Sequence, residues 1–107
     1  MAKLGETIEA LARTIEARRG ADSETSWSAR LIADPALAAK KLAEEAMETA
    51  LAAVQGDRAA VAAESADLVY HWLALLAALD VSLDEVADAL RAREGRSGIE
   101  EKNSRLP

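Results

Sequence analysis

Two long helical segments separated by a three-residue turn constrain the fold of this chain more than any other feature. The first is predicted over residues 35–54 and begins at Asp34-Pro35, where Asp can cap free amides and Pro fits the first helical position. The second is predicted from residue 57 or 58 to about residue 79, and Gln55-Gly56-Asp57 forms a tight turn between them. So short a turn makes the two helices antiparallel neighbours.

Shorter helical segments flank this pair. Apolar residues recur at helical spacing from about residue 4 to residue 19, and residues 27–33 have the apolar content of a short helical turn. Ser82 and Glu85 form the pattern of a capping box, which predicts a helix that runs to about residue 93. No segment alternates like a strand. The expected fold is therefore all-α, a four-helix-bundle-like single domain over residues 1–107 with a polar tail from residue 95.

Alanine and leucine supply most of the apolar residues, which make up 50% of a 107-residue chain with no Phe and only 3% aromatic residues. Because Ala is the best helix former and Leu, Glu, Lys and Arg follow it closely, this composition favours helices that pack through small side chains. Such a unit buries little area, and residues 68–79 are apolar on more than one side. We therefore expect a homodimer or a higher homo-oligomer.

The charge of the chain excludes several classes of partner. A formal net charge of −6 and a pI near 4.8 argue against nucleic acid and against an anionic membrane surface. No apolar run approaches the roughly 20 residues that span a bilayer, and Glu6 and Glu9 interrupt any signal-peptide core, so a cytoplasmic protein is expected. There is no Cys for a thiolate metal site. An anionic substrate would need a bound cation, such as a divalent metal.

The two long helices place acidic residues on faces that can meet, because spacings of three and four put side chains on one side of a helix. Glu48 precedes the turn by about as many residues as Glu64 follows it, so both lie about 10 Å from the turn at about 1.5 Å per residue. The faces are therefore predicted to oppose each other. Their residues are Lys41, Glu44, Glu45 and Glu48 in the first helix, and Glu64, Asp67 and His71 in the second.

Carboxylates that face one another repel and raise each other's pKa, and a divalent cation removes that penalty. Ligand sets made only of oxygen favour Mg²⁺ or Mn²⁺, which polarise a phosphoryl oxygen while a carboxylate positions the attacking water. The alternative is a solvated face on which each Glu pairs with Lys or Arg. Two clusters at matched height, with Glu64 and Asp67 next to an apolar stretch, favour the metal site.

The other side chains near this face each have two interpretations. His71, the only His, is either a metal or substrate contact or, as we favour, a structural group bonded to a neighbouring carboxylate. Tyr70 is expected near the pocket and Trp72 in the core. Trp27 either stacks on a purine or packs on the bundle.

Positive charge gathers in the tail of this acidic chain. Gly95-Arg96-Ser97-Gly98 offers backbone amides, a hydroxyl and a guanidinium, which suit a phosphate or phosphoribosyl group. We predict that the tail is mobile alone and becomes ordered over a substrate, the alternative being a frayed, solvated terminus. The cationic residues are Arg91, Arg93, Arg96, Lys102 and Arg105.

Two motifs resemble a known superfamily, the all-alpha, MazG-like nucleotide pyrophosphohydrolases. With residues 26–31 and 93–102, they are most similar to its phosphoribosyl-ATP pyrophosphatase family, and the resemblance extends over nearly the whole chain. The tail is the segment that narrows the resemblance to this family. The motifs are Lys41-Leu42-x-Glu44-Glu45-x-x-Glu48 and Glu64-x-x-Asp67-Leu68-x-Tyr70-His71.

The resemblance implies a hydrolase that converts phosphoribosyl-ATP and water to phosphoribosyl-AMP and pyrophosphate, the second step of histidine biosynthesis. The bond attacked is the anhydride between the alpha and beta phosphates. The resemblance also implies dependence on Mg²⁺ and a dimer whose subunits both contribute helices to the working unit.

The resemblance further implies roles for single residues. Glu44 would be a ligand, a water-orienting base or a partner of the ligands, and with Glu45 and Glu48 it forms the catalytic group. The metal ligands would be Glu45, Glu48, Glu64 and Asp67, and Lys41 would meet a phosphate. From the residues themselves, we expect Tyr70 and His71 to contact the ligands without binding the metal. The further candidate substrate contacts are Arg30, Arg93, Arg96, Ser97 and Lys102.

One loop departs from the family pattern. The family usually has Tyr, Thr and Lys where this chain has Trp27, Ser28 and Arg30. Ser28 keeps the hydroxyl and Arg30 the charge, whereas Trp27 keeps an aromatic ring without the phenol hydroxyl.

Two other functions remain as alternatives. A related pyrophosphohydrolase for nucleoside triphosphates would use the same acidic site but would not need the cationic tail. A non-catalytic helical dimerisation module would tolerate Glu48→Gln or Asp67→Asn, because either change lowers repulsion.

Overall fold

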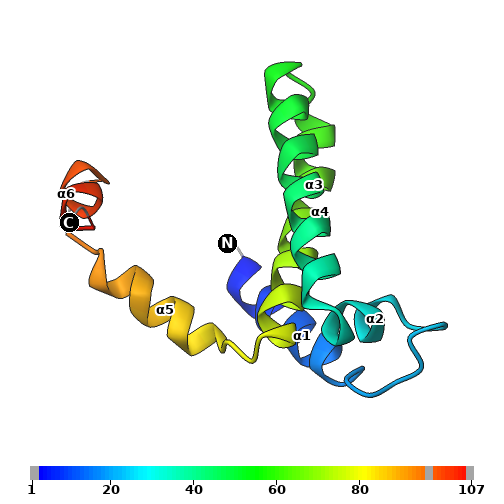
Figure 1. The fold of residues 1–107 in the computed structure, drawn as a ribbon. Coiled ribbons are helices and arrows are strands. Elements are labelled where there is room, and N and C mark those ends of the chain that lie inside the picture. The colour runs from blue at the N-terminus through cyan, green and yellow to red at the C-terminus, as the bar shows by residue number, and fades with distance from the viewer. Residues whose placement is uncertain (1–2, 96–97, 106–107) are drawn as a thin grey trace.

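Every regular element in residues 3–95 and 98–105, the part of the chain that the computed structural model describes, is a helix (Figure 1). The all-α prediction is therefore confirmed. In this same part of the chain, no helix is both long and apolar enough to cross a bilayer. The helices are α1 (Leu4–Glu16), α2 (Trp27–Ala33), α3 (Pro35–Val54), α4 (Arg58–Ala78), α5 (Leu83–Ala92) and α6 (Gly98–Ser104).

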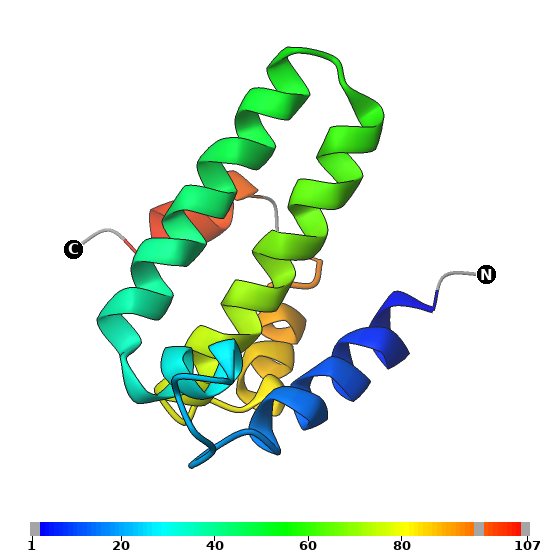
Figure 2. The same ribbon diagram turned by 90° about the vertical axis from the view of Figure 1, so that its right-hand side faces the viewer.

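Helices α3 and α4 form an antiparallel hairpin, which is the longest part of the molecule (Figure 2). The Asp34 side chain accepts a hydrogen bond from the Leu37 amide at 3.1 Å and so caps α3, as predicted. Asp57 caps α4 in the same way, through the Ala60 amide at 3.0 Å. Between them Gly56 has a φ of 72°, a left-handed conformation that suits glycine and completes the tight turn.

The hydrophobic core lies at the end of the hairpin away from this turn, where α1 and α2 pack against α4 (Figure 2). Ile15, Ile32 and Leu73 meet there, and Trp72 packs against them as expected. Ala38 and Ala74 are fully buried with Leu31, so small side chains let α3 and α4 approach closely at this end. The core therefore anchors one end of the hairpin only.

Helix α1 ends at Glu16, earlier than the predicted residue 19. The amides of Arg18 and Arg19 bond carbonyls three residues back, so the last turn tightens. The Arg19 side chain bonds both Glu16 and the Ala77 carbonyl, the latter at 2.7 Å. Arg19 thereby ties the end of α1 to the end of α4.

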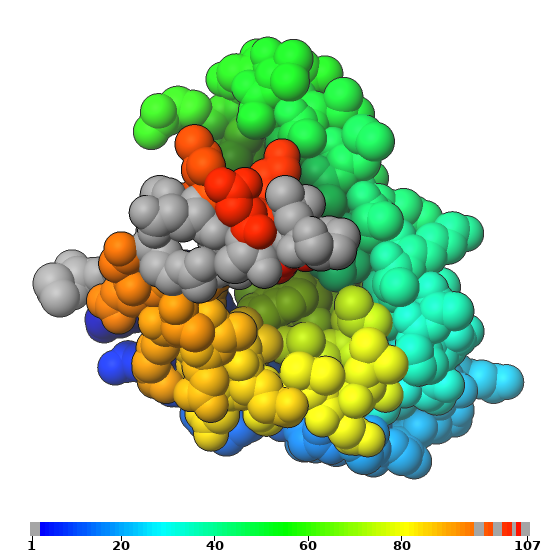
Figure 3. All heavy atoms as spheres, turned by 60° about the vertical axis from the view of Figure 1, so that its left-hand side comes forward, coloured from blue at the N-terminus to red at the C-terminus, as the bar shows by residue number. Residues whose placement is uncertain are grey.

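Helices α5 and α6 stand apart from the rest of the chain (Figure 1). The predicted capping box starts α5. The Ser82 amide donates to the Glu85 carboxylate at 2.8 Å, and the Glu85 amide donates to the Ser82 hydroxyl at 3.1 Å. Although α5 is amphipathic, it buries no residue, and Leu83 at its start packs against the core. Figure 3 shows α5 beside the end of α4. Within the described part of one chain, α5 therefore adds no buried residue to the packing of the other helices.

Residues 98–104 of the polar tail form a helix, α6. This helix begins at Gly98 and contains Glu100, Glu101 and Lys102, which are good helix formers. The predicted substrate residues Arg96 and Ser97 lie outside the described residues.

Candidate metal centre and active site

Three carboxylates from the two hairpin helices gather at one place. Glu45 and Glu48 come from α3 and Glu64 from α4, and one oxygen of each lies within 4.8 Å of the others. This is the opposition of acidic faces that the matched distances from the turn predict. The tight turn at Gly56 sets the register of the two helices and so the matched height of these charges.

Two oxygens of this cluster are buried and unpartnered. Glu45 has only 8% of its surface exposed and Glu64 is half-buried, and neither Glu45 Oε2 nor Glu64 Oε2 has a hydrogen-bond partner. A buried acceptor left without a partner costs stability, so native proteins normally satisfy it. A cation between the helices would do so for both groups.

The electrostatics of Glu64 show how close the carboxylates are. Its pKa is raised to about 7, first because a hydrogen bond to Glu48 favours its protonated form, then because burial disfavours its charge and Glu48 repels it. Glu45 adds smaller effects of the same sign. The raised pKa of Glu64 therefore reflects negative charge that a bound cation would compensate.

The chemistry of this donor set fits a hard divalent cation. Three carboxylates from two rigid helices supply only oxygen, which Mg²⁺ and Mn²⁺ prefer over nitrogen and sulfur. A site with three protein carboxylates also leaves positions for water and phosphate oxygens. The cluster can therefore bind a metal.

The remaining predicted acidic residues lie near this cluster but outside it. Glu44 forms an ion pair with Lys41 at 3.1 Å, which raises the pKa of Lys41. Asp67 is one turn beyond Glu64 on α4 and is exposed. Neither Glu44 nor Asp67 belongs to the three-carboxylate group.

His71 is buried and is bonded on both ring nitrogens. Its Nδ1 lies 2.8 Å from the main-chain carbonyl of Asp67, and its Nε2 lies 3.2 Å from the indole nitrogen of Trp27. A carbonyl only accepts and an indole only donates, so His71 is neutral with its proton on Nδ1. The favoured structural role is thus consistent with its contacts, but its partners are a carbonyl and an indole instead of a carboxylate.

A second hydrogen bond attaches α2 to α4. The Ser28 hydroxyl and the Tyr70 phenol lie 2.5 Å apart, next to the Trp27–His71 pair. Arg30 lies on the outer side of α2, with its guanidinium carbon 5.8 Å from the centre of the Trp27 ring. The departures from the family loop motif are therefore all in one small contact region.

The described tail residues do not reach the acidic cluster in this structure. Arg93 and Lys102 are exposed, and α5 and α6 lie away from the hairpin (Figure 1). Their substrate contacts stay a prediction.

The chain that carries this acidic cluster is similar to known proteins over most of its length. Residues 8–94 match the family described as phosphoribosyl-ATP pyrophosphohydrolase. The chain belongs to this family. It is therefore one of a family of hydrolases, as its resemblance implies.

Relatives of similar length bear the name phosphoribosyl-ATP pyrophosphatase. One from a Caulobacter species is 62% identical over 98% of both chains, and one from Caulobacter vibrioides is 62% identical over 96% of both. One from Paracoccus denitrificans is 56% identical over 92% of both. This member of the phosphoribosyl-ATP pyrophosphohydrolase family thus matches its relatives nearly end to end.

The contacts between α2 and α4 in this family member were not predicted from the sequence. The pairing of Trp27 with His71 joins residues 44 positions apart, and that of Ser28 with Tyr70 joins residues 42 apart. The one signal in the sequence was the unusual Trp in the loop motif, which replaces a phenol by an indole donor.

Proposed function

We propose that this chain hydrolyses phosphoribosyl-ATP to phosphoribosyl-AMP and pyrophosphate with Mg²⁺, in the cytoplasm and as the second step of histidine biosynthesis. The observation that best supports the proposal is the three-carboxylate cluster with two buried, unpartnered oxygens, in a chain of the phosphoribosyl-ATP pyrophosphohydrolase family. Relatives that match it nearly end to end bear the name of this activity.

Glu45, Glu48 and Glu64 would hold the Mg²⁺, with Asp67 as a further ligand one turn along α4. When bound, the ion would polarise a phosphoryl oxygen and neutralise charge that develops on the pyrophosphate. Glu44 is then the carboxylate next to the ligands that remains to orient the attacking water.

The chain's own cations complete the proposed site. Lys41 is already bound to Glu44, so a substrate phosphate that takes over Lys41 would free the Glu44 carboxylate to accept a proton from water. Arg30 would contact a phosphate from α2. Arg93, Arg96, Ser97 and Lys102 would contact the phosphoribosyl group when the tail lies over it.

Pyrophosphate release from phosphoribosyl-ATP and from common nucleoside triphosphates tests the substrate. We expect release from phosphoribosyl-ATP with Mg²⁺, little release from ATP, and none with EDTA. Equal release from all nucleotides would instead support a general nucleoside triphosphate pyrophosphohydrolase.

Substitution of one ligand separates an enzyme from a dimerisation module. Glu48→Gln keeps the side-chain shape but removes a charge from the metal group, so activity should fall at least about 100-fold. Glu9→Gln on α1 changes the net charge equally and should leave activity unchanged. An unchanged rate in Glu48→Gln would support the non-catalytic module.

Truncation after Glu94 tests the role of the tail. Because the proposed tail contacts hold the phosphoribosyl end, the KM should rise by about tenfold or more, as expected when one or two charge-assisted hydrogen bonds are lost. If both KM and kcat stay at the wild-type values, the tail has no part in substrate binding.

We propose a homodimer as the working unit. The exposed area of 7608 Å² exceeds the about 5,700 Å² expected for a compact monomer of this mass. The radius of gyration of 15.7 Å likewise exceeds the about 13 Å of a compact chain of this length. A second copy would cover exposed apolar residues on α3 and α5, which include Met47, Leu51, Val54 and Leu90.

A further inference from the structure

The Trp27 side chain is hydrogen-bonded to a buried residue along one edge and exposed to solvent along another. Its indole nitrogen donates to His71 at 3.2 Å, and the two rings meet edge to face at 73° with centres 6.3 Å apart. His71 is itself fixed by the Asp67 carbonyl at 2.8 Å and by Tyr70, whose ring centre is 4.9 Å away. The indole is thus oriented by a buried partner, yet 38% of Trp27 remains exposed.

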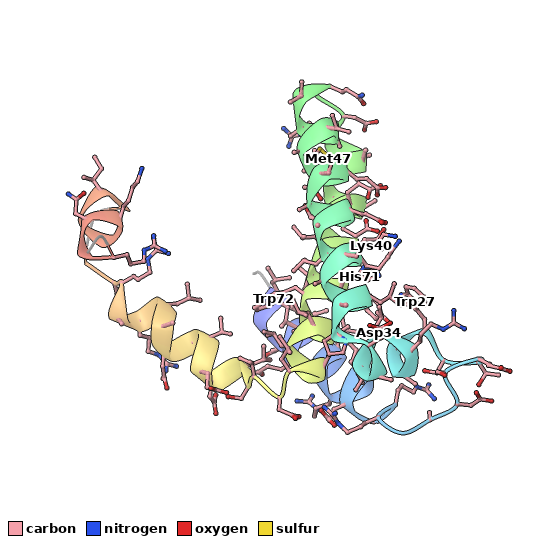
Figure 4. The ribbon with its side chains drawn as sticks, in the orientation of Figure 1. Trp27, Asp34, Lys40, Met47, His71 and Trp72 are labelled. Carbon is pink, nitrogen blue, oxygen red and sulfur yellow. The ribbon has the colours of Figure 1, made fainter. Side chains whose placement is uncertain are left out.

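A large aromatic side chain that is both fixed and exposed is unusual in a chain with three aromatic residues. Trp72, the other Trp, lies on the opposite side of the hairpin and packs into the core (Figure 4). Trp27 and His71 lie together on the side of α2 (Figure 4). Packing alone would explain Trp72, but it leaves the exposed part of Trp27 without a function.

Arg30 gives this surface a charge. Its Nε donates to the Ser23 carbonyl at 3.0 Å, which fixes the guanidinium near the indole. Its two terminal nitrogens have no hydrogen bond or ion pair with another described residue. The Arg30 guanidinium lies over one face of the indole, and an aromatic ring beside such free donors is suited to a nucleotide, whose base stacks and whose phosphate accepts hydrogen bonds.

The position of this surface relative to the carboxylates fits one ligand. Glu64, Asp67 and His71 follow one another along one face of α4, and His71 is seven residues from Glu64. At about 1.5 Å per residue this separation is about 10 Å, which a nucleotide can span from its phosphates to its base. One end of such a ligand would reach the acidic cluster and the other would reach Trp27.

We propose that the exposed indole of Trp27, oriented by His71, is the platform on which the adenine ring of the substrate stacks. This inference rests on the proposed function, since it assigns the base subsite of the same nucleotide. His71 acts here as a positioning residue, because its hydrogen bond to Trp27 sets the angle of the ring. The Arg30 guanidinium, whose carbon is 5.8 Å from the centre of the same indole, lies beside the stacked base.

Fluorescence gives a test that is independent of turnover. In the Trp72→Phe variant Trp27 is the only tryptophan, so its emission can be excited selectively. AMP should quench this emission whereas ribose 5-phosphate, which lacks a base, should not. AMP quenching should weaken in Trp72→Phe/His71→Ala, where the indole loses its fixed orientation. Equal responses to AMP and ribose 5-phosphate would overturn the proposal.

Kinetics with phosphoribosyl-ATP gives the second test. Because stacking of a base on an aromatic side chain is worth a factor of about 5 to 160, Trp27→Ala should raise KM within that range with a smaller change in kcat. Trp27→Phe keeps a stacking ring and should change KM by less than about threefold. The matched control Trp72→Phe should leave KM unchanged.

The outcomes separate this inference from the proposed function. If Trp27→Ala lowers only the melting temperature while KM stays constant, Trp27 is a packing residue and the inference is wrong. If wild-type protein releases no pyrophosphate from phosphoribosyl-ATP, the proposed function fails, whereas selective quenching by AMP would still support a base subsite.

Discussion

Glu64 links the acidic cluster to the stability of the protein. Its pKa is raised from 4.5 to about 7, first by the hydrogen bond to Glu48 and then by burial. The folded state therefore binds more protons than the unfolded state between these two pH values. Stability must fall as pH rises through this window, because the proton that compensates the cluster is lost.

We predict that the melting temperature of the metal-free protein falls between pH 4.5 and pH 7 and that Glu64→Gln removes this part of the fall. Mg²⁺ should raise the melting temperature more at pH 8 than at pH 5, because at low pH protons compete for the carboxylates. Thermal unfolding in EDTA and in Mg²⁺ measures both effects. A Mg²⁺ response of the same size in Glu64→Gln and in wild type would contradict the assignment of Glu64.

Asp80 has an unfavourable backbone conformation. Its φ is 56°, in the left-handed region that glycine adopts without strain, and it follows the end of α4. Its contact with Arg19 at 3.4 Å is exposed to solvent and contributes little. The strain is thus larger than the gain from the ion pair.

We predict that Asp80→Gly stabilises the fold by about 0.5–1 kcal/mol. Asp80→Ala should destabilise it, because Ala keeps the strained conformation and loses the ability of Asp to bond locally. Urea unfolding of the three proteins measures the difference. A more stable Ala variant would show that backbone strain is not the main effect at this position.

For single residues, the sequence predicts which side chains lie together when their positions depend on helical spacing alone. Glu45, Glu48 and Glu64 could be placed together because the turn at Gly56 sets their heights. The partner of His71 could not be predicted, since the approach of α2 to α4 depends on packing in three dimensions. Nor does helical spacing alone show that Glu64 belongs to the three-carboxylate group whereas Asp67 does not.

Individual helices in this chain begin where a side chain caps them. We predict that Asp34→Ala lowers stability by about 1 kcal/mol, since α3 loses the acceptor of the Leu37 amide. Asp34→Asn keeps that acceptor and should change stability by less than half as much. Urea unfolding measures both, and equal losses would show that the charge of Asp34 matters more than its hydrogen bond.

Capping also explains which elements the sequence predicts well. The starts of α3, α4 and α5 follow Asp34, Asp57 and Ser82, and each of these side chains bonds the expected amide. The end of α1 depends on Arg19 reaching Ala77, and this tertiary contact leaves no local pattern. Helix α6 has no apolar stripe that would predict it.

The whole molecule exposes more surface than a chain of its size should. Helix α5 has an apolar stripe that includes Leu83, Val86 and Leu90, and Leu90 is 61% exposed. Composition predicted an oligomer for the same reason, since small side chains bury little area. Which helix would meet a second copy needed the structure, because it depends on the direction in which α5 leaves α4.

We predict that Leu90→Glu shifts the protein from dimer to monomer without loss of helix content, because a charge would be buried in the interface. The control Ala92→Glu places the same charge about 200° around α5, nearly opposite. Sedimentation and circular dichroism measure the two properties. A dimeric Leu90→Glu protein would show that α5 lies outside the interface.

The one-sided anchoring of the hairpin has a mechanical consequence. Ala38 and Ala74 pack α3 and α4 together near the core, and from there the two helices extend to the turn at Gly56. The carboxylates lie about 10 Å or more from this packed pair, so a small change in the crossing angle of the helices produces a larger change in the distance between the carboxylates. A cation bound between them would restrain the two helices, and amide exchange near the turn should slow when Mg²⁺ is added.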